Sequence, residues 1–455
     1  MRTSISTSAI AAAILVAGSA HAAPSADEVK GLGTTLTAWG AEVAGNKDGT
    51  IPAYTGGVQN PPKVDYGTGV LPDPFASDKV LFWIDTKNMD QHADKLSPGT
   101  QEMLKRYPTF RIAVYPTRRS ASYPDQVIDN TIKNATRCAL KDDGETLDIS
   151  NGCRGGFPFP IPKTGKEVMW NMKANYMGAG RIHLLESNFV KPNGEVVNVN
   201  KMYAYEDNQL YDPNTPVPTR HWGIRTEYSA PTRLVGQSTL IFDTLEKGTR
   251  RAWSYQPSTR RVRLSPDLAA DTPIATNGGA MVYDELNLFS GAMDRWDFEL
   301  LGKKEMYIPY NVYLTGGRSE CTVAGGFYTP NHANPECIRW ELRRVWHVSA
   351  TLKEGKRHVY GKREFFLDED TWFGGIQDAY DLNGKLYRSV WTPLRPDYVK
   401  HAPNVGTPTT AFDLSSGSYV WGFIHKAWSL DKPLPAVRLS SDSLPNFVLR
   451  DPAVD

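Results

Sequence analysis

Long apolar runs are scarce in this sequence. The run near the N-terminus, Ala9 to Ala17, is far shorter than the roughly 20 residues that a membrane-spanning helix needs. No later segment approaches that length without charged residues. The sequence therefore predicts no membrane-spanning helix.

An excess of charge of one sign is also lacking. The chain has 51 basic and 50 acidic residues. A protein that captures nucleic acid or an anionic membrane electrostatically usually has a clear basic excess. We therefore expect no nucleic acid among its partners.

The motifs that identify common enzyme classes are missing. There is no G-x-S-x-G elbow, no H-E-x-x-H pair, no glycine-rich phosphate loop and no dinucleotide fingerprint. The nine histidines are scattered singly. We interpret the acidic run Asp368-Glu369-Asp370 as a solvated turn rather than a cation site. The sequence thus predicts no catalytic residue, no metal site and no cofactor.

What the N-terminus does contain is an export signal. Arg2 supplies a positive charge, Ala9 to Ala17 the apolar run, and Ala20-His21-Ala22 a small-x-small cleavage site before Ala23. A lipoprotein signal would place a cysteine directly after that site, whereas the first cysteine is Cys138. We expect a periplasmic protein of a Gram-negative-type bacterium, cleaved after Ala22 and not a lipoprotein.

The four cysteines form two local pairs, Cys138 with Cys153 and Cys321 with Cys337. In an oxidising compartment this spacing predicts two local disulfides, each worth about 3 kcal/mol if its geometry is unstrained. A zinc site is the alternative, and it is disfavoured because neither pair has the two-residue spacing typical of zinc ligands.

Length and composition predict the domain organisation. Removing residues 1–22 from 455 leaves 433, enough for one large elaborated domain or two intimately joined ones. Residues 23–75 are broken by glycine and proline and predict an irregular N-terminal arm. Residues 76–455 are expected to form a single β-rich domain, with a long loop near 135–165 tied down by the first disulfide. Before that loop, one or two short helices fit, the second opening at Ser97-Pro98.

Hairpin signals follow downstream. Five turn sequences each separate two strand-like runs, at residues 192–194, 246–248, 353–355, 383–384 and 415–417. A strand in which apolar and charged residues alternate is expected from Asp294 to Leu300. Together these signals predict an antiparallel meander.

The clearest strand is expected from Ile338 to Ala350, where apolar and charged residues alternate. We expect the apolar face to be buried and the other face to be wet. The first charged residues of the wet face are Arg339, Glu341 and Arg343. Arg344 breaks the apolar face, so it is either paired inside or marks a bulge. Strands of this length curl, which predicts a mainly β fold with a large curved antiparallel sheet, a few covering helices and long irregular loops.

Several strings resemble known families. The segment Gly248–Arg263 looks like a strand-turn-strand of lipoprotein carriers of the LolA/LolB type. A wider set of strings resembles domain-of-unknown-function family 1329: Gly33–Thr37, Gly40–Pro52, Gly56-Gly57, Tyr107–Arg111, Tyr115–Arg119, Phe157–Gly165, Gly302–Asn311, Arg344–Trp346 and Ala350–Lys353. This resemblance implies a lipoprotein-carrier-like half-barrel without catalytic residues. The partners that it implies are an RND-type inner-membrane transporter and an outer-membrane protein.

Three functions remain open on the sequence alone. The leading hypothesis is a carrier or binding protein for an apolar ligand such as a lipid or sterol. A periplasmic hydrolase acting on an acyl or envelope substrate, and an envelope assembly factor that contacts protein only, are the alternatives. For the carrier we predict an apolar cavity lined by some of Trp253, Tyr255, Trp296, Phe298, Trp340, Leu342 and Trp346. The competing interpretation is that these side chains are plain core.

Overall fold

The computed structural model describes residues 23–445 except 247, 267, 269, 278, 316–318, 404–408, 431 and 435–438. The predicted signal peptide and its cleavage site, residues 1–22, lie outside the described residues. In the part that the structure describes, no helix has both the length and the apolar character needed to cross a membrane.

Strands dominate the fold. The helices are short and few: α1 (Ala26–Lys30), α2 (Pro98–Arg106), α3 (Asp125–Arg137) and α4 (Gly165–Lys173). The strands before the middle of the chain are β1 (Phe82–Ile84), β2 (Ile112–Val114), β3 (Ala139–Leu140), β4 (Leu147–Asp148), β5 (Gly180–Val190), β6 (Val196–Asp207), β7 (Arg220–Ala230), β8 (Ser238–Thr244), β9 (Arg250–Gln256) and β10 (Arg261–Leu264). The later strands are β11 (Trp296–Pro309), β12 (Arg339–Leu352), β13 (Lys362–Asp368), β14 (Gly375–Tyr380), β15 (Leu386–Thr392), β16 (Thr410–Asp413) and β17 (Tyr419–Leu430).

Fifteen strands form one large sheet. Its order is β1-β2-β12-β13-β14-β15-β16-β17-β5-β6-β7-β8-β9-β10, and β11 pairs with β12. All five predicted turns join neighbouring antiparallel strands, so the expected meander is confirmed. The exception to the antiparallel prediction is β2, which pairs in parallel with β12 over two residues. The predicted mainly β fold with one large curved sheet is therefore confirmed, and the sheet is mixed rather than purely antiparallel.

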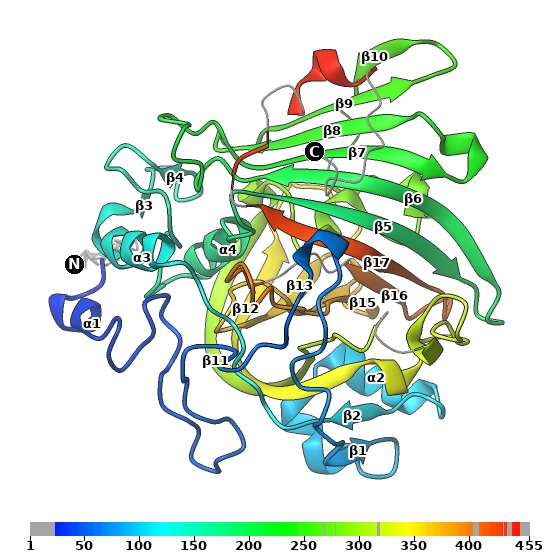
Figure 1. Cartoon of the computed structure of the whole chain (residues 1–455), viewed down its shortest axis with the longest axis horizontal. Coiled ribbons are helices and arrows are strands. Elements are labelled where there is room, and N and C mark those ends of the chain that lie inside the picture. Colours follow the sequence, from blue (N-terminus) through cyan, green and yellow to red (C-terminus); the bar gives the residue numbers. More distant parts are fainter. Residues whose placement is uncertain are drawn as a thin grey trace, which may run out of the picture.

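The curvature of the sheet follows from the residues that meet inside it. Eight strands separate β9 from β13 in the sheet order: β14, β15, β16, β17, β5, β6, β7 and β8. Nevertheless Arg250 of β9 and Arg363 of β13 both bond to one short stretch of chain, residues 279–293. We call this stretch the inner segment. Because it touches strands so far apart in the order, the sheet must curl around it, and Figure 1 shows β11 and β12 bending around one side while β5 to β10 fan out on the other.

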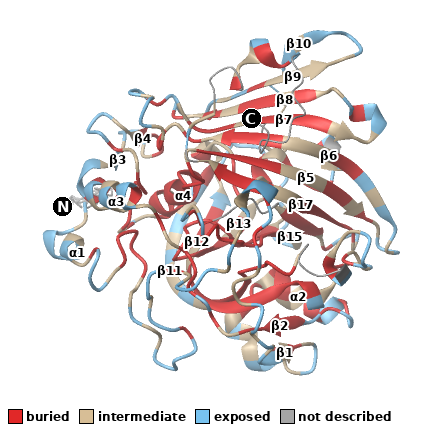
Figure 2. Ribbon diagram, viewed as in Figure 1, coloured by how far each residue is buried: buried red, intermediate tan, exposed pale blue. Residues whose placement is uncertain are grey.

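Helices cover the two faces of the sheet at different places. Helix α4 packs against β11 and β12, and α2 packs against β15. Ser97 caps α2 through the backbone of Thr100, with Pro98 as its first residue, as the sequence predicted. Figure 2 shows that α4 and the strands around it are largely buried, whereas α1 and the β9–β10 hairpin carry exposed residues.

The contact between α2 and the sheet rests on one buried carboxyl. Asp378 of β14 accepts hydrogen bonds from the Gly99 backbone N–H (2.6 Å) and from the Ser389 hydroxyl (2.8 Å). A Cβ atom at Gly99 would lie 2.3 Å from this carboxyl, so glycine is required for the close approach. Its neighbour Gln377 bonds to Arg363, and successive residues of a strand point to opposite faces. Helix α2 and the inner segment therefore cover opposite faces of the sheet.

Asp378→Asn is expected to remove a pH-dependent loss of stability. Burial raises the pKa of Asp378 to about 6, so the fold favours the protonated carboxyl. The stability that this group contributes is full below about pH 4 and is lost as the pH rises through 6. At ~1.4 kcal/mol per pKa unit, the variant should gain about 2–3 kcal/mol relative to the wild type between pH 4 and 7.5. Urea unfolding of variant and wild type at pH 4 and at pH 7.5 measures this gain. The control is Asp129→Asn, a change at an exposed residue of α3. If the stability difference between Asp378→Asn and the wild type were the same at both pH values, the prediction would be contradicted.

Strand β12 departs from the expected pattern of one buried and one wet face. The residues placed on the wet face, Arg339, Glu341 and Arg343, are all at most 2% exposed. The wet-face prediction is therefore wrong. Its physical reason is that residues 115–120 and Asp78 lie over that face and supply hydrogen-bond and ion-pair partners. Arg344 is paired inside, with Glu369, rather than marking a bulge.

Both cysteine pairs are disulfide-bonded in the structure. The S–S distances are 1.99 Å for Cys138–Cys153 and 2.01 Å for Cys321–Cys337. The first joins the end of α3 to the loop before α4, and it closes a segment that contains the small β3–β4 hairpin. Two disulfides are typical of an exported protein.

Candidate functional site

The concave face of the sheet is apolar in two places. On β7, β8 and β9, Trp222, Ile241 and Ala252 are buried together with Met177. On β11 and β13, Phe298 and Phe365 pack edge-on against Phe289 of the inner segment, with ring centroids 5.7 and 5.9 Å from it. The inner segment thus fills the hollow between these two apolar areas.

The seven aromatic and aliphatic residues predicted to line a cavity lie in several places. Trp296 and Phe298 lie on the concave face near the inner segment. Trp340 packs against Trp391, and Leu342 is buried in the same large core. Trp346 stacks on Trp372.

The remaining two predicted residues lie on the opposite face. Trp253 pairs with Leu240 in the β8–β9 register, whereas the concave residues there are Ile241 and Ala252. Trp253 and Tyr255 pack with a C-terminal segment that contributes Leu439 and Leu444. The structure therefore does not bring the seven residues together into one lining.

Two carboxylates anchor the inner segment to the sheet. Asp284 accepts hydrogen bonds from Arg363 Nη1 (2.9 Å) and from His358 Nε2 (3.1 Å). Glu285 accepts from the Tyr360 hydroxyl (2.5 Å) and from Arg388 Nη1 (3.0 Å). These anchors join the segment to β13 and β15.

The other end of the inner segment is held by polar contacts as well. Arg250 donates to the carbonyl of Ser290 (2.6 Å), and the buried ammonium of Lys173 donates to the carbonyl of Gly291. The backbone N–H of Asn287 donates to the Thr409 hydroxyl (2.8 Å). The segment is therefore joined to the sheet by these side-chain contacts and is not part of its β-ladder. Its backbone bonds instead to the preceding residues 270–274, which lie outside the strands.

The electrostatics of these anchors are those of buried ion pairs. Burial by itself would raise the pKa of Asp284, but Arg363 and His358 outweigh it and hold that pKa far below its usual range. Arg363 is completely buried and Arg388 is 4% exposed. Separating either arginine from its carboxylate would leave a charge in a poorly hydrated place.

Sequence reasoning missed the inner segment and its anchors. Arg363 and Phe365 share one parity in their strand, as do Arg388 and Val390. At both positions an arginine therefore lies on the face of the strand that otherwise carries apolar residues, as Arg344 does in its own strand. The sequence did not show that Asp284 and Glu285, about 80 and 100 residues away, would meet them.

A small hollow of about 40 Å³ lies at the end of α4. It is lined by Lys173, His221 and Asp243 among others. Burial lowers the pKa of Lys173 to about 8 and that of His221 to about 3, so His221 is neutral at pH 7. Asp243 pairs with Arg250 (2.5 Å). The hollow has room for about one water molecule and not for a substrate.

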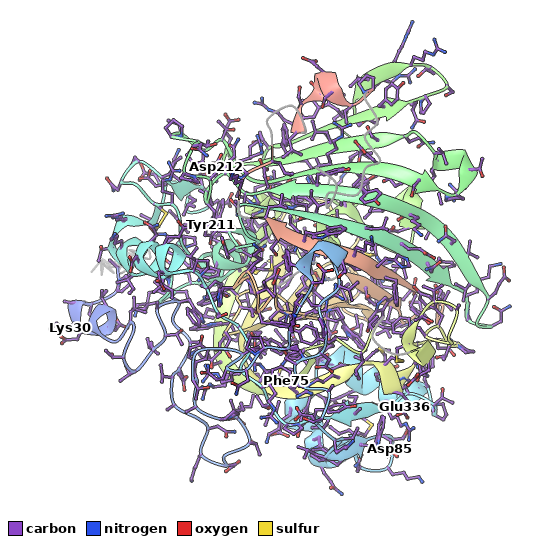
Figure 3. The ribbon with its side chains drawn as sticks, viewed as in Figure 1. Lys30, Phe75, Asp85, Tyr211, Asp212 and Glu336 are labelled. Carbon is purple, nitrogen blue, oxygen red and sulfur yellow. A yellow bond between two sulfur atoms is a disulfide. The ribbon has the colours of Figure 1, made fainter. Side chains whose placement is uncertain are left out.

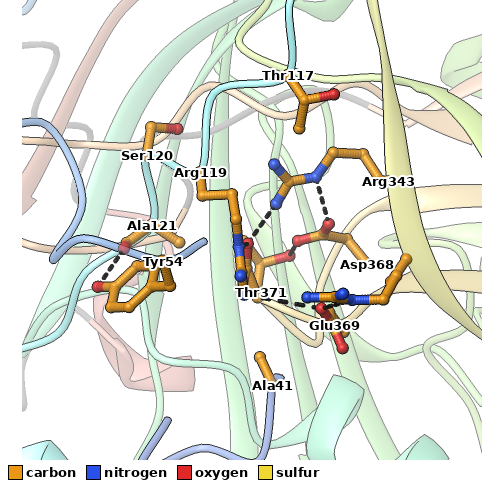
Figure 4. Close-up of polar contacts among 12 residues, drawn as sticks. Ala41, Tyr54, Thr117, Arg119, Ser120, Ala121, Arg343, Asp368, Glu369 and Thr371 are labelled. Carbon is orange, nitrogen blue, oxygen red and sulfur yellow. Dashed lines mark hydrogen bonds and ion pairs between the residues drawn. The ribbon is translucent and has the colours of Figure 1, made fainter. Parts of the chain in front are cut away.

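The acidic run Asp368-Glu369-Asp370 is buried, and the prediction of a solvated turn is wrong. Each of the three residues is at most 2% exposed. Figure 4 shows that arginines surround them: Arg343 donates to Asp368 (2.8 Å) and Asp370 (2.6 Å), and Arg119 donates to Asp370 through two nitrogens. Arg344 and Lys303 both bond to Glu369. Because cationic side chains occupy the positions that a cation would take, this cluster joins chain segments rather than forming a metal site.

Three of the scattered histidines, His332, His347 and His358, have separate partners. His332 bonds to Thr109, His358 to Asp284, and His347 lies 3.7 Å from Glu364. In the described part of the chain, no group of three or more His, Cys, Asp and Glu side chains is arranged to hold a metal ion.

Two adjoining surface hollows lie at the ends of β5, β6 and β17. Their volumes are about 510 and 360 Å³, and both are lined by Gln126, Tyr176, Tyr211 and Pro213. We call the two together the rim groove. Figure 3 labels Tyr211 and its neighbour Asp212 near the ends of these strands. None of the seven residues predicted to bind ligand lines this groove.

Comparisons with known proteins find one matching family and one similar protein of a known genome. The model of a family described as "Protein of unknown function (DUF1329)" matches residues 83–438. An uncharacterised protein of Pseudomonas aeruginosa is 41% identical over 420 residues, 89% of both chains.

Solved structures with lower similarity cover 62% of this chain. One is a putative outer membrane lipoprotein-sorting protein domain from Vibrio parahaemolyticus, with 15% identity, 98% of its own length and a TM-score of 0.44. Another is a LolA superfamily protein from Nitrosomonas europaea, with 10% identity, 99% of its own length and a TM-score of 0.38.

Proposed function

The chain belongs to the DUF1329 family, and we propose that it is a periplasmic carrier that binds an apolar compound, such as a lipid or sterol, between the inner and outer membranes. The site that we propose for this compound is the concave face of the sheet. The partners implied by the sequence resemblance, an RND-type transporter and an outer-membrane protein, remain part of this proposal.

One observation carries the proposal: the apolar concave face is covered by a segment that has little regular structure. Residues 279–293 contain one three-residue 3-10 turn, Tyr283–Glu285, and the first residue of another, Met293–Arg295. A covering that is joined to the sheet by side-chain contacts, and not by strand pairing, can leave the concave face without breaking the sheet's ladder. Its departure would expose Trp222, Ile241 and Phe298 to a ligand, and apolar contact would then offset the loss of the anchors.

The export of the chain is supported by two features. The sequence begins with a signal-peptide pattern, and both cysteine pairs are joined as disulfides, which persist in an oxidising compartment.

The hydrolase alternative would require an activated nucleophile. Ser122 lies 2.9 Å from His401 Nδ1, a contact that resembles the first half of a catalytic triad. Among the described residues, no carboxylate is bonded to the other ring nitrogen of His401. The contact therefore supplies no oriented base, and the carrier is the function that the geometry favours.

Locking the inner segment in place should block ligand uptake. The Asn287 backbone nitrogen and the Thr409 hydroxyl are 2.8 Å apart, so the two residues are neighbours, and the cysteine pair N287C/T409C is designed to join them by a disulfide. In the oxidised double variant we expect binding of the apolar fluorescent probe 1-N-phenylnaphthylamine to fall at least tenfold. The measurement is a fluorescence titration of the mature protein.

Each single cysteine variant serves as a matched control for the lock and should bind the probe as the wild type does. A locked protein that still binds the probe normally would show that the concave face is not the site. Organic-solvent extraction of the wild-type protein from periplasm, followed by mass spectrometry, would identify the natural ligand.

A further inference from the structure

The rim groove has an unusual charge for this protein. Its lining includes four basic side chains and one histidine: Arg137, Arg154, Lys400, Lys432 and His401. None of the described lining residues is aspartate or glutamate. Because the whole chain has nearly equal numbers of basic and acidic residues, this one-sided lining reflects placement and not composition.

Three of the four basic side chains, Arg137, Arg154 and Lys432, keep their positive charge available to a ligand. Arg154 is half-buried, and its guanidinium donates to two backbone carbonyls, those of Asp212 (2.6 Å) and Pro216 (3.2 Å). Arg137 and Lys432 are exposed at opposite ends of the groove. Within the described part of the chain, no carboxylate pairs with these three residues. A cation held by carbonyls alone keeps its full charge for an incoming anion.

Part of the remaining lining is apolar. Tyr176 and Tyr211 are in edge contact, with ring centroids 5.2 Å apart, and Val399, Leu430 and Pro433 face the same hollow. The groove therefore combines a basic edge with an apolar surface, which suits a molecule that has an acidic group and an aliphatic part.

One short stretch of chain joins the groove to the concave face. After α4, Tyr176 lines the groove, while the next residue, Met177, packs against Trp222 on the concave face. Lys173, at the end of α4, bonds to Gly291 of the inner segment. The two places are thus separated by a single layer of chain.

We propose that the rim groove binds the acidic head group, phosphate or carboxylate, of an amphiphile whose aliphatic part reaches the concave face. This inference rests on the proposed carrier function and names its ligand class as anionic amphiphiles. The basic side chains that line the groove attract and hold the head group, and the tyrosines contact the first carbons of the chain.

Three probes separate the contributions of charge and chain. Isothermal titration of the mature protein with dodecyl phosphate should show binding at least tenfold tighter than with octaethylene glycol monododecyl ether, which has the chain without the charge. Inorganic phosphate, which has the charge without the chain, should also bind at least tenfold more weakly than dodecyl phosphate. Binding of dodecyl phosphate should weaken as the salt concentration rises.

The variant R137Q/K432Q removes one charge from each end of the groove. Both side chains are exposed, so the fold should be retained, and circular dichroism checks this. We expect at least tenfold weaker binding of dodecyl phosphate and unchanged binding of the neutral ether. The matched control is K47Q/R233Q, two exposed basic residues outside the groove, which should leave both affinities unchanged.

The outcomes distinguish this inference from the carrier proposal. Equal affinity for dodecyl phosphate and the neutral ether, or unchanged affinity in R137Q/K432Q, would overturn the head-group site while leaving an apolar carrier intact. Inorganic phosphate that binds as tightly as dodecyl phosphate would identify the ligand as a free anion and overturn the amphiphile. Failure of every chain-bearing probe to bind would overturn the carrier together with this inference.

Discussion

Arg343→Met is expected to lower the free energy of unfolding by about 3–5 kcal/mol, the usual cost of leaving a buried charge without its partner. Arg343 is 2% exposed, bonds to Asp368 and Asp370, and donates to the Arg118 carbonyl at 3.2 Å. Methionine preserves much of the side-chain volume, but it removes the positive charge that Asp368 and Asp370 share. The two neighbouring carboxylates then repel each other. Urea unfolding followed by tryptophan fluorescence would measure the loss.

The control for Arg343 is a surface ion pair of the same chemistry. Arg111 bonds to Glu336, and both side chains are nearly half exposed, so Arg111→Met should cost no more than about 1 kcal/mol. Because protonation relieves uncompensated carboxylates, the deficit of Arg343→Met should be smaller at pH 5 than at pH 7.5. Similar small losses in both variants would show that the buried cluster is not a stabilising junction.

Asp284→Asn is expected to release the inner segment. The change leaves Arg363, which is fully buried, without its charged partner, at a cost of about 3–5 kcal/mol. The strands keep their ladder hydrogen bonds, so we expect the inner segment to open rather than the sheet to unfold. Amide exchange in residues 279–293 should then accelerate at least 100-fold, while binding of 1-N-phenylnaphthylamine should increase.

A second aspartate between β10 and β11, Asp271, provides the control. Asp271 pairs with Arg295 at 3.2 Å, and both side chains are about one-third exposed, so Asp271→Asn should change stability by less than about 1 kcal/mol. Faster exchange throughout the sheet in Asp284→Asn, without increased probe binding, would mean that the inner segment is ordinary core. The concave face would then have no place for a ligand.

Local patterns in the sequence were enough to predict the antiparallel meander. Turn sequences such as Asn383-Gly384 act over a few residues, and each of the five joins two neighbouring strands. The short spacing of the cysteines made local pairing the expected result for the same reason. Alternation also located β12 to within two residues at either end.

Alternation could not reveal what covers each face of a strand. The parity of β12 correctly separated Trp340 from Arg343, but the charged side proved to be buried, because Arg119 and the 368–370 turn lie against it. A charged residue is solvated by default, and only partners distant in the sequence change that. Parity likewise could not show that Trp253 faces away from the concave side, because one strand's inward direction is defined only once the sheet has curled.

The sequence by itself determined the export pattern, the family, the strands with their turns and the cysteine spacing, because each depends on residues that are close together in the chain. Only the tertiary structure decided where a ligand could bind. The inner segment reaches both Arg250 and Arg363, whose strands are separated by eight others in the sheet. The rim groove gathers residues from six separate stretches between 124 and 433. Such sites arise from the curvature of the sheet, which sums small twists over many strands, and no local stretch of sequence contains that sum.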